Sequence, residues 1–188
     1  MKKTYIIGIA GGSASGKSTL AERLVSEFSP YNAKLFAMDS YYKPESDLPL
    51  ATTENGKQYR DYNCPDSFEL GQLKSDIQEA KDNYNIIIIE GLLTLWDNEI
   101  CNLCDLRVFV DCPADIRIVR RIKRNLAWGL SLEDITNVYL DLVRYRHEEF
   151  VEPSKAKSDV VIDSAMGIDN GLKRLYATIN RYKIQRDL

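Results

Sequence analysis

The chain has little that would hold it in a membrane or against a polyanion. Its 188 residues contain no apolar run near the roughly 18 consecutive residues that a membrane-spanning helix needs. The formal net charge is only −3, so there is no general attraction to nucleic acid or to an anionic membrane surface. The start, Met-Lys-Lys, leads into an apolar strand and does not resemble a signal peptide. We therefore expect a cytoplasmic protein without a nucleic-acid or membrane partner, in which any phosphate-binding site is local.

Residues that commonly bind metals are also scarce. Of the four cysteines, only Cys101 and Cys104 stand at metal-ligand spacing; the others are Cys64 and Cys112. No second pair or histidine partner completes a zinc site in the sequence, so we interpret all four as reduced thiols. The single histidine, His147, lies in a predicted helix, and we interpret it as structural.

The length suits one well-buried core and is short for two full domains. The composition, 44% hydrophobic and 28% charged, is ordinary for a globular protein. The sequence shows no internal repeat, low-complexity tract or interdomain linker. We expect a single domain over residues 1–188.

A glycine-rich stretch near the start is the strongest motif. Residues 11–18 match G-x-x-x-x-G-K-[ST], between an apolar strand at 6–10 and a helix from 17 to about 28. Glycines let backbone N–H groups approach phosphate oxygens, while Lys17 can reach the β- and γ-phosphates and Ser18 can ligate Mg²⁺. The alternative is a glycine-rich turn that binds nothing. The predicted ATP-binding residues are Gly11, Gly12, Ser13, Ala14, Ser15, Gly16, Lys17, Ser18 and Thr19.

Two carboxylates stand at the ends of predicted strands. Asp39 follows the strand at 34–38, and Glu90 ends the unbroken β-branched run at 85–90. Ligands of an open parallel sheet lie beyond the carboxyl ends of its strands, where the phosphate-binding loop also lies. We therefore predict a Mg²⁺ site at Ser18 and Glu90. The alternative for Glu90 is a helix-capping role in the next loop.

The segment at 40–65 has no sustained hydrophobic period and is rich in Tyr, Pro, Asp, Asn and Lys. A loop this long in a compact domain is usually functional or disordered, and its four tyrosines argue against disorder. We interpret residues 40–66 as the loop that binds the acceptor substrate. The alternative is a surface excursion packed by its own aromatic side chains.

A helix that begins near Pro113, after a strand at 106–111, carries a basic stripe. Its four arginines lie within about 60° of one line along the helix, with apolar residues opposite. No acidic partner stands at i±4 among them, which is unusual for a solvated face. We predict that residues 113–130 form a lid whose guanidinium groups close over transferring phosphates; a plain solvated face is the alternative. The arginines are Arg117, Arg120, Arg121 and Arg124, and the apolar residues are Ile118, Val119, Ile122 and Leu126.

The remaining elements complete an alternating pattern. Helices are predicted at about 67–81, at 131–150 after a capping box, and at 169–181, with a strand at 159–163. Five strands alternating with helices predict an α/β fold: a P-loop NTPase with a five-stranded, doubly wound parallel sheet, helices on both faces and a small lid.

Six segments resemble, in the same order, motifs of the uridine kinase and phosphoribulokinase family of P-loop kinases. They are GGSASGKST, MDSYYK, YNCPDSF, IIIIEGLL, LRVFVDCPADIRIVRRIKR and YRHEEFVEPSKAKSDVVI, and the similarity covers most of the chain. The resemblance implies that Asp39 is the base that accepts the proton of the acceptor hydroxyl and that Lys17 and Ser18 serve ATP and Mg²⁺. It also implies that Glu90 supports the metal and that Arg120 and Arg124 are lid contacts.

The sequence departs from uridine kinases in the parts that read the acceptor. Residues 81–85 connect a helix directly to the Glu-Gly strand, where uridine kinases carry a pyrimidine-reading hairpin with Tyr and His. The lid motif E-R-G-R is replaced by residues 127–130 (AWGL), and Asn63 stands where the family has a ribose-binding Asp. The stretch at 41–46, followed by ENG and Tyr62, is similar to nicotinamide riboside kinases. The predicted acceptor-binding residues are Asp39, Tyr41, Tyr42, Lys43, Tyr62, Asn63, Asp66 and Phe68.

The expected function is transfer of the ATP γ-phosphoryl group to the 5′-hydroxyl of a nucleoside, as in uridine and cytidine kinases. One alternative is a kinase for nicotinamide riboside or another small metabolite. A second is a nucleotide-binding regulator with weak or no catalysis; a guanine-specific N-K-x-D motif is absent, which counts against a GTPase. The sequence leaves homo-oligomer formation open.

Overall fold

A five-stranded parallel sheet with the order β2-β5-β1-β6-β7 forms the centre of the computed structural model, which describes residues 4–53 and 56–186, with side chains as far as 179. All four strand pairings are parallel. The strands are β1 (Tyr5–Gly11), β2 (Ala33–Ala37), β5 (Ile86–Glu90), β6 (Leu106–Asp111) and β7 (Val160–Asp163). Each bound lies within one residue of its predicted position, and the doubly wound α/β fold is confirmed.

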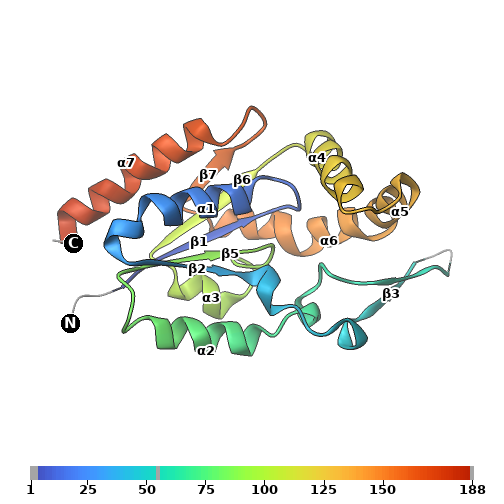
Figure 1. The fold of residues 1–188 in the computed structure, drawn as a ribbon, viewed down its shortest axis with the longest axis horizontal. Helices are drawn as coiled ribbons and strands as arrows, with labels where there is room; N and C mark the ends of the chain where they lie inside the picture. Colours follow the sequence, from blue (N-terminus) through green and yellow to red (C-terminus); the bar gives the residue numbers. More distant parts are fainter. Residues whose placement is uncertain (1–3, 54–55, 187–188) are drawn as a thin grey trace.

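Helices cover both faces of the sheet (Figure 1). One face packs on α1 (Lys17–Glu27) and α7 (Asp169–Arg186), and the other on α2 (Leu70–Ala80) and α3 (Asn98–Leu103). Every residue of β1 and β5 is buried, because side chains on both faces of these strands meet a helical layer. This explains the unbroken apolar runs that made the two strands predictable.

The lid and the acceptor loop lie at one end of the molecule (Figure 1). The lid helix α4 spans Ala114–Ala127 and is followed by α5 (Leu132–Val138). The helix then continues through a π-helical segment (Tyr139–Val143), α6 (Arg144–Arg146) and a second π-helical segment (His147–Val151). The predicted helix at 131–150 is therefore present, but two π-helical segments interrupt its α-helical hydrogen bonding.

The structure differs from expectation in three short elements. The acceptor loop contains a two-stranded antiparallel hairpin of β3 (Leu50–Thr52) and β4 (Gln58–Arg60), too short for a sequence period to reveal. Helix α3 has only six residues and was not predicted for the same reason. Helix α2 begins at Leu70 and not near 67, because Phe68 is extended and forms a β-bridge with Tyr42.

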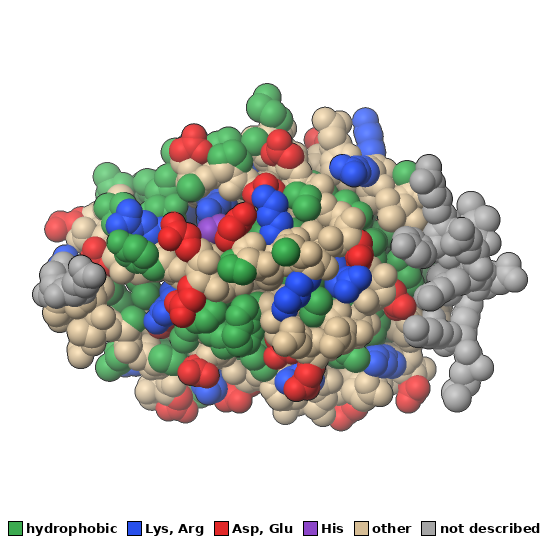
Figure 2. Space-filling model, turned by 180° about the vertical axis from the view of Figure 1, so that it is seen from behind, with side chains coloured by type: hydrophobic (Ala, Val, Ile, Leu, Met, Phe, Trp, Pro, Cys, Tyr) green, Lys and Arg blue, Asp and Glu red, His purple; other side chains and the backbone are tan. Residues whose placement is uncertain are grey.

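Charged side chains of both signs are interspersed over the face shown in Figure 2, in keeping with the small net charge. Within the described residues, no helix combines the length and apolar character needed to cross a membrane.

Candidate active site

The phosphate-binding loop connects β1 to α1 at the carboxyl edge of the sheet. Gly16 has φ of +96°, a left-handed conformation that favours glycine, and helix α1 begins at the next residue. Gly16 has no side chain to cap the helix, and the first turn of α1 carries no acidic residue. The first N–H groups of α1 are therefore available to an anion, as the motif predicts.

Three polar side chains meet beside the first turn of α1: Lys17 and Ser18 of that turn, and Glu90 at the end of β5. The Ser18 hydroxyl donates a hydrogen bond of 2.9 Å to Glu90 Oε1, and Lys17 Nζ lies 3.5 Å from the same oxygen. Glu90 reaches this position because β5 pairs with β1 so that Glu90 lies opposite Ile9. The next helix, α3, is instead capped by the Asp97 side chain. Glu90 therefore does not cap α3, and its contacts lie on the side of the phosphate-binding loop.

These groups fit Mg²⁺ held largely by a bound triphosphate. A serine hydroxyl and a carboxylate are hard oxygen ligands, and Mg²⁺ is usually bound by one or two carboxylates together with substrate phosphates and water. Among the residues that the structure describes, no group of three or more His, Cys, Asp or Glu could hold a metal by itself.

The phosphate-binding loop rests on a buried polar layer. A Cβ atom added at Gly12 would lie 2.6 Å from Arg117 Nη1 and 3.0 Å from His147 Cε1, so only glycine allows this close packing. Arg117 is itself buried, and its Nε donates to the carbonyl oxygen of Cys112 at 2.9 Å. Arg117 therefore packs closely against the phosphate-binding loop.

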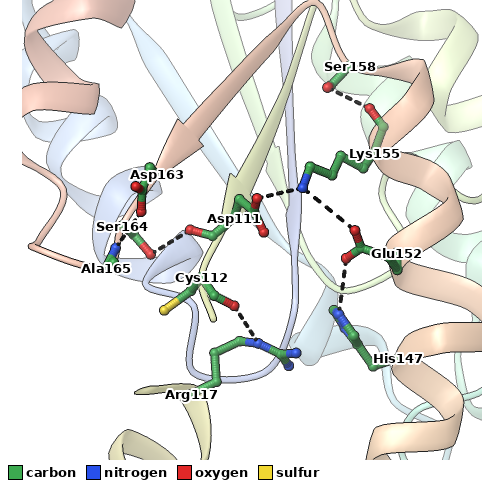
Figure 3. A network of polar contacts seen from close by, with 10 residues as sticks. All are labelled: Asp111, Cys112, Arg117, His147, Glu152, Lys155, Ser158, Asp163, Ser164 and Ala165. Atoms are coloured by element: carbon green, nitrogen blue, oxygen red, sulfur yellow. Dashed lines mark hydrogen bonds and ion pairs between the residues drawn. The ribbon is translucent and has the colours of Figure 1, made fainter. Parts of the chain in front are cut away.

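His147 belongs to the same layer (Figure 3). Its Nε2 lies 3.3 Å from Glu152 Oε2, and Lys155 lies between the carboxylates of Glu152 and Asp111. Burial, and after it the charge of Arg117, lowers the pKa of His147 to about 4. His147 is therefore neutral at physiological pH.

A first pocket, of about 430 Å³, opens beside the start of α1. It is formed by the phosphate-binding loop, the lid helix and the turn between β7 and α7. The residues of that turn, Gly167 and Ile168, were not predicted, because nothing in a strand-to-helix turn distinguishes them from an ordinary connection. The lining residues are Ala14, Gly16, Lys17, Ser18, Thr19, Arg120, Arg124, Gly167 and Ile168.

A second pocket, of about 280 Å³, lies between the phosphate-binding loop, the acceptor loop and the lid. It brings together eight of the predicted site residues: Ser13, Lys17, Ser18, Asp39, Tyr42, Tyr62, Asn63 and Arg124. It also contains Arg121 of the predicted lid stripe and five residues that were not predicted, namely Arg60, Leu92, Asn125, Trp128 and Val138. Lys17, Ser18 and Arg124 line both pockets, so the two cavities meet at these three residues.

The lid arginines divide into two pairs. Arg121 Nη1 and Arg124 Nη2 contact Ser13 Oγ in the phosphate-binding loop, at 3.0 Å and 3.3 Å. Burial lowers the pKa of both guanidinium groups, which nevertheless remain charged. Arg120 lines the first pocket, but its Nη2 donates to the carbonyl oxygen of Ser164 at 2.9 Å. Arg117 packs against Gly12 of the phosphate-binding loop. Arg121, which the family resemblance did not single out as a lid contact, reaches the loop alongside Arg124.

The apolar side of α4 is only partly covered. Val119 and Leu126 are exposed, at 50% and 47%, whereas Ile118 and Ile122 are half-buried. Arg121 and Arg124, on the other side of the helix, contact the phosphate-binding loop.

Four predicted acceptor-binding residues lie outside the second pocket. The Tyr41 hydroxyl donates to Asp76 on α2 at 2.7 Å, and Phe68 is buried and stacks on Tyr42 with ring centroids 4.4 Å apart. Lys43 and Asp66 are not among the residues that line the pocket. Phe68 therefore acts on the pocket through Tyr42, whose hydroxyl donates to the Tyr62 carbonyl oxygen at 2.9 Å.

Comparisons with known proteins agree with this geometry. The chain matches the family described as Phosphoribulokinase / Uridine kinase over residues 6–85 and 76–169. It is 34% identical to a uridine kinase of Clostridium botulinum (strain Okra), covering 86% of this chain and 89% of that one. It is 31% identical to a uridine kinase of Lactococcus lactis, covering 96% and 100%. The alignment with the second enzyme has 209 positions against 188 residues here, so that enzyme contains segments that this chain lacks.

A solved structure from Silicibacter, assigned by its name to fructose transport system kinases, has the same fold. The TM-score is 0.65 at 16% identity, and the match covers 86% of this chain and 90% of that one. The parallel sheet, the phosphate-binding loop and the sequence matches lead to one conclusion: the chain belongs to the phosphoribulokinase and uridine kinase family.

Proposed function

We propose that this kinase transfers the γ-phosphoryl group of ATP to the 5′-hydroxyl of a nucleoside. The observation that carries the proposal is the meeting of the two pockets at Lys17, Ser18 and Arg124. A triphosphate in the first pocket and an acceptor in the second would have their reacting groups next to each other. Phosphoryl transfer requires positioning and neutralisation of charge more than covalent chemistry by the protein.

The donor is held by the phosphate-binding loop. Backbone N–H groups at the start of α1 and the Lys17 ammonium bind the phosphates, and Arg121 and Arg124 stabilise negative charge from the lid side. Ser18 and Glu90 would hold Mg²⁺, which neutralises charge on the phosphate oxygens when it is bound. The 2.9 Å contact between Ser18 and Glu90 supports this assignment.

The acceptor is activated by Asp39. This residue follows β2 at the carboxyl edge of the sheet and lines the second pocket together with Lys17 and Ser18. A carboxylate there can orient the acceptor hydroxyl and accept its proton. The hydroxyl oxygen then attacks the γ-phosphorus, the bond to the β,γ-bridging oxygen breaks, and ADP leaves.

The second pocket suits a small acceptor with a planar ring and hydroxyl groups. Tyr62 and Trp128 are exposed aromatic side chains on its lining, and Asn63 and Arg60 supply hydrogen-bonding groups. The names of the related uridine kinases favour uridine or cytidine. Nicotinamide riboside is the second candidate, because the acceptor loop resembles nicotinamide riboside kinases at 41–46 and at Tyr62.

A single-turnover assay with an acceptor panel tests the proposal. The protein is mixed with ATP, Mg²⁺ and uridine, cytidine, nicotinamide riboside, pantothenate or ribulose 5-phosphate, and the phosphorylated product is measured. We expect a 5′-monophosphate from a nucleoside. Product only from a non-nucleoside acceptor would change the substrate class, and intact ATP binding without product from any acceptor would favour the nucleotide-binding regulator.

A further inference from the structure

The acceptor loop contains a carboxylate that does not face the pocket. Asp61 is fully buried, yet three of the residues around it in sequence, Arg60, Tyr62 and Asn63, line the second pocket. A buried carboxylate is costly unless it is paired and hydrogen-bonded. Asp61 lies in the middle of a pocket-lining segment, so its partners determine which parts of the structure that segment is attached to.

Each polar group of Asp61 has a partner. Oδ2 accepts a hydrogen bond of 2.6 Å from Arg146 Nε, and Oδ1 accepts one of 2.8 Å from the backbone N–H of Asn63. The backbone N–H of Asp61 donates to the Pro49 carbonyl oxygen at 2.8 Å, and its carbonyl oxygen accepts from the Ser67 hydroxyl. One residue thus joins the hairpin, the pocket-lining segment and a distant helix.

That helix is the one that follows the lid. Arg146 ends α6, between the two π-helical segments, in a helix that begins at α5 and whose residue Val138 lines the second pocket. A second contact ties the hairpin to the same helix, because the Tyr59 hydroxyl donates to Asp141 at 2.7 Å. π-Helical turns change the direction of the side chains that follow them and occur frequently at functional sites.

We propose that the Asp61–Arg146 ion pair is a positioning device for the acceptor: it fixes Asn63 and its neighbours in the pocket wall and so sets acceptor affinity without touching the acceptor. The proposal rests on the function proposed above. The carboxylate constrains Asn63 directly through the backbone N–H, and Arg146 supplies the opposite charge that pairs with the buried carboxylate. The first pocket, in which we place ATP, is formed by other elements, namely the phosphate-binding loop, the lid helix and the β7–α7 turn.

Steady-state kinetics of Arg146→Gln separate positioning from a general structural role. We expect the KM for the acceptor to rise at least about 10-fold and the KM for ATP to change less than about 2-fold, because only the acceptor wall loses its anchor. In the double variant Asp61→Asn/Arg146→Gln the buried charge is gone, so the acceptor KM should return toward the wild-type value. Arg144→Gln, on the same helix with an exposed side chain, is the matched control and should leave both values unchanged.

Hydrogen exchange followed by mass spectrometry gives a readout that does not need the reaction. In Arg146→Gln we expect faster exchange in peptides covering 58–68 and unchanged exchange in α1 and β1. Faster exchange throughout the protein, or equal rises in both KM values, would overturn the proposal. If the wild-type protein phosphorylates no acceptor, the proposed function fails, and the exchange pattern alone decides whether the ion pair positions this segment.

Discussion

Several charged side chains of this protein are buried, and Lys17, Glu90 and Asp61 are each paired with a side chain of opposite charge. Lys17 and Glu90 are both nearly buried and lie 3.5 Å apart, while Asp61 is paired with Arg146. Burying such charges without partners would be strongly unfavourable. Lys17 lines both pockets, and Asp61 lies between residues that line the second one, so both pairs are linked to the geometry of the site.

His147 provides a test at this scale, because its pKa is lowered to about 4 by burial and by Arg117. The folded protein binds fewer protons at this residue than the unfolded chain between pH 6.5 and pH 4, so the stability that depends on neutral His147 is lost as the pH falls through this window. We expect the unfolding free energy of the wild type, relative to His147→Gln, to fall by up to about 3 kcal/mol across it. Chemical denaturation at several pH values measures the difference, and a difference independent of pH would contradict the assignment.

The sequence motif predicted which residues lie together at the phosphate-binding loop better than it predicted those that line the second pocket. Lys17, Ser18 and Glu90 meet as expected because a phosphate-binding loop has one local geometry and Glu90 has a fixed register in the sheet. Arg60 and Trp128 could not be predicted, because their place in the pocket depends on how the acceptor loop and the lid fold over each other. Tertiary packing of loops leaves no periodic signal in a sequence.

At the scale of elements, helix α4 is unusual because its arginines contact the protein while two of its apolar residues are exposed. Its arginine face is turned toward the phosphate-binding loop, where Arg121 and Arg124 contact Ser13, and its apolar residues Val119 and Leu126 remain half exposed. The stripe of arginines at i, i+3, i+4 and i+7 indicated this face correctly, because like charges repel on an ordinary solvated surface.

Arg124→Ala tests the role of this helix. Arg124 lies where the two pockets meet, so we expect kcat to fall by roughly 10², the usual effect of removing one preorganised charge-stabilising donor. Its neighbour Lys123 is exposed and lines neither pocket, so Lys123→Ala is the matched control. Equal effects of the two substitutions on kcat would show that only the overall charge of the helix matters.

Elements with long hydrophobic patterns could be predicted, and short ones could not. The five strands of the main sheet lie within one residue of expectation, since buried parallel strands are continuous runs of β-branched and apolar residues. The three-residue strands β3 and β4 and the six-residue helix α3 are too short to repeat a hydrophobic period. The two π-helical segments were not predicted from the sequence, which indicated one continuous helix at 131–150.

At the scale of the whole molecule, the two pockets share the end of the sheet where the strands have their carboxyl ends. The phosphate-binding loop and Asp39 follow strands of this sheet and Glu90 ends one, and the lid and acceptor loop lie at the same end (Figure 1). This placement follows from parallel topology alone, which is why the fold and the approximate location of the site were predictable together.

Ligand binding to this end should stabilise the whole fold. At ATP and Mg²⁺ concentrations near 100 times Kd, linkage predicts about 2.7 kcal/mol of added stability. For a chain of this length that corresponds to a rise of roughly 5–10 °C in the thermal midpoint. EDTA should remove most of the shift, and Ser18→Ala should reduce it, whereas the exposed α2 substitution Ser75→Ala should not. If ATP raised the thermal midpoint of Ser18→Ala as much as that of the wild type, both with and without Mg²⁺, the result would contradict the metal site.

The most direct test of the central claim, that this family member transfers phosphoryl groups with Asp39 as the base, is a single-turnover comparison of the wild type with Asp39→Asn. Both proteins are mixed with ATP, Mg²⁺ and the acceptor that gives product in the panel, and ATP binding is measured in parallel; the exposed Asp82→Asn serves as control. We predict unchanged ATP affinity and a transfer rate lower by at least about 10² in Asp39→Asn. A transfer rate near that of the wild type would contradict the account.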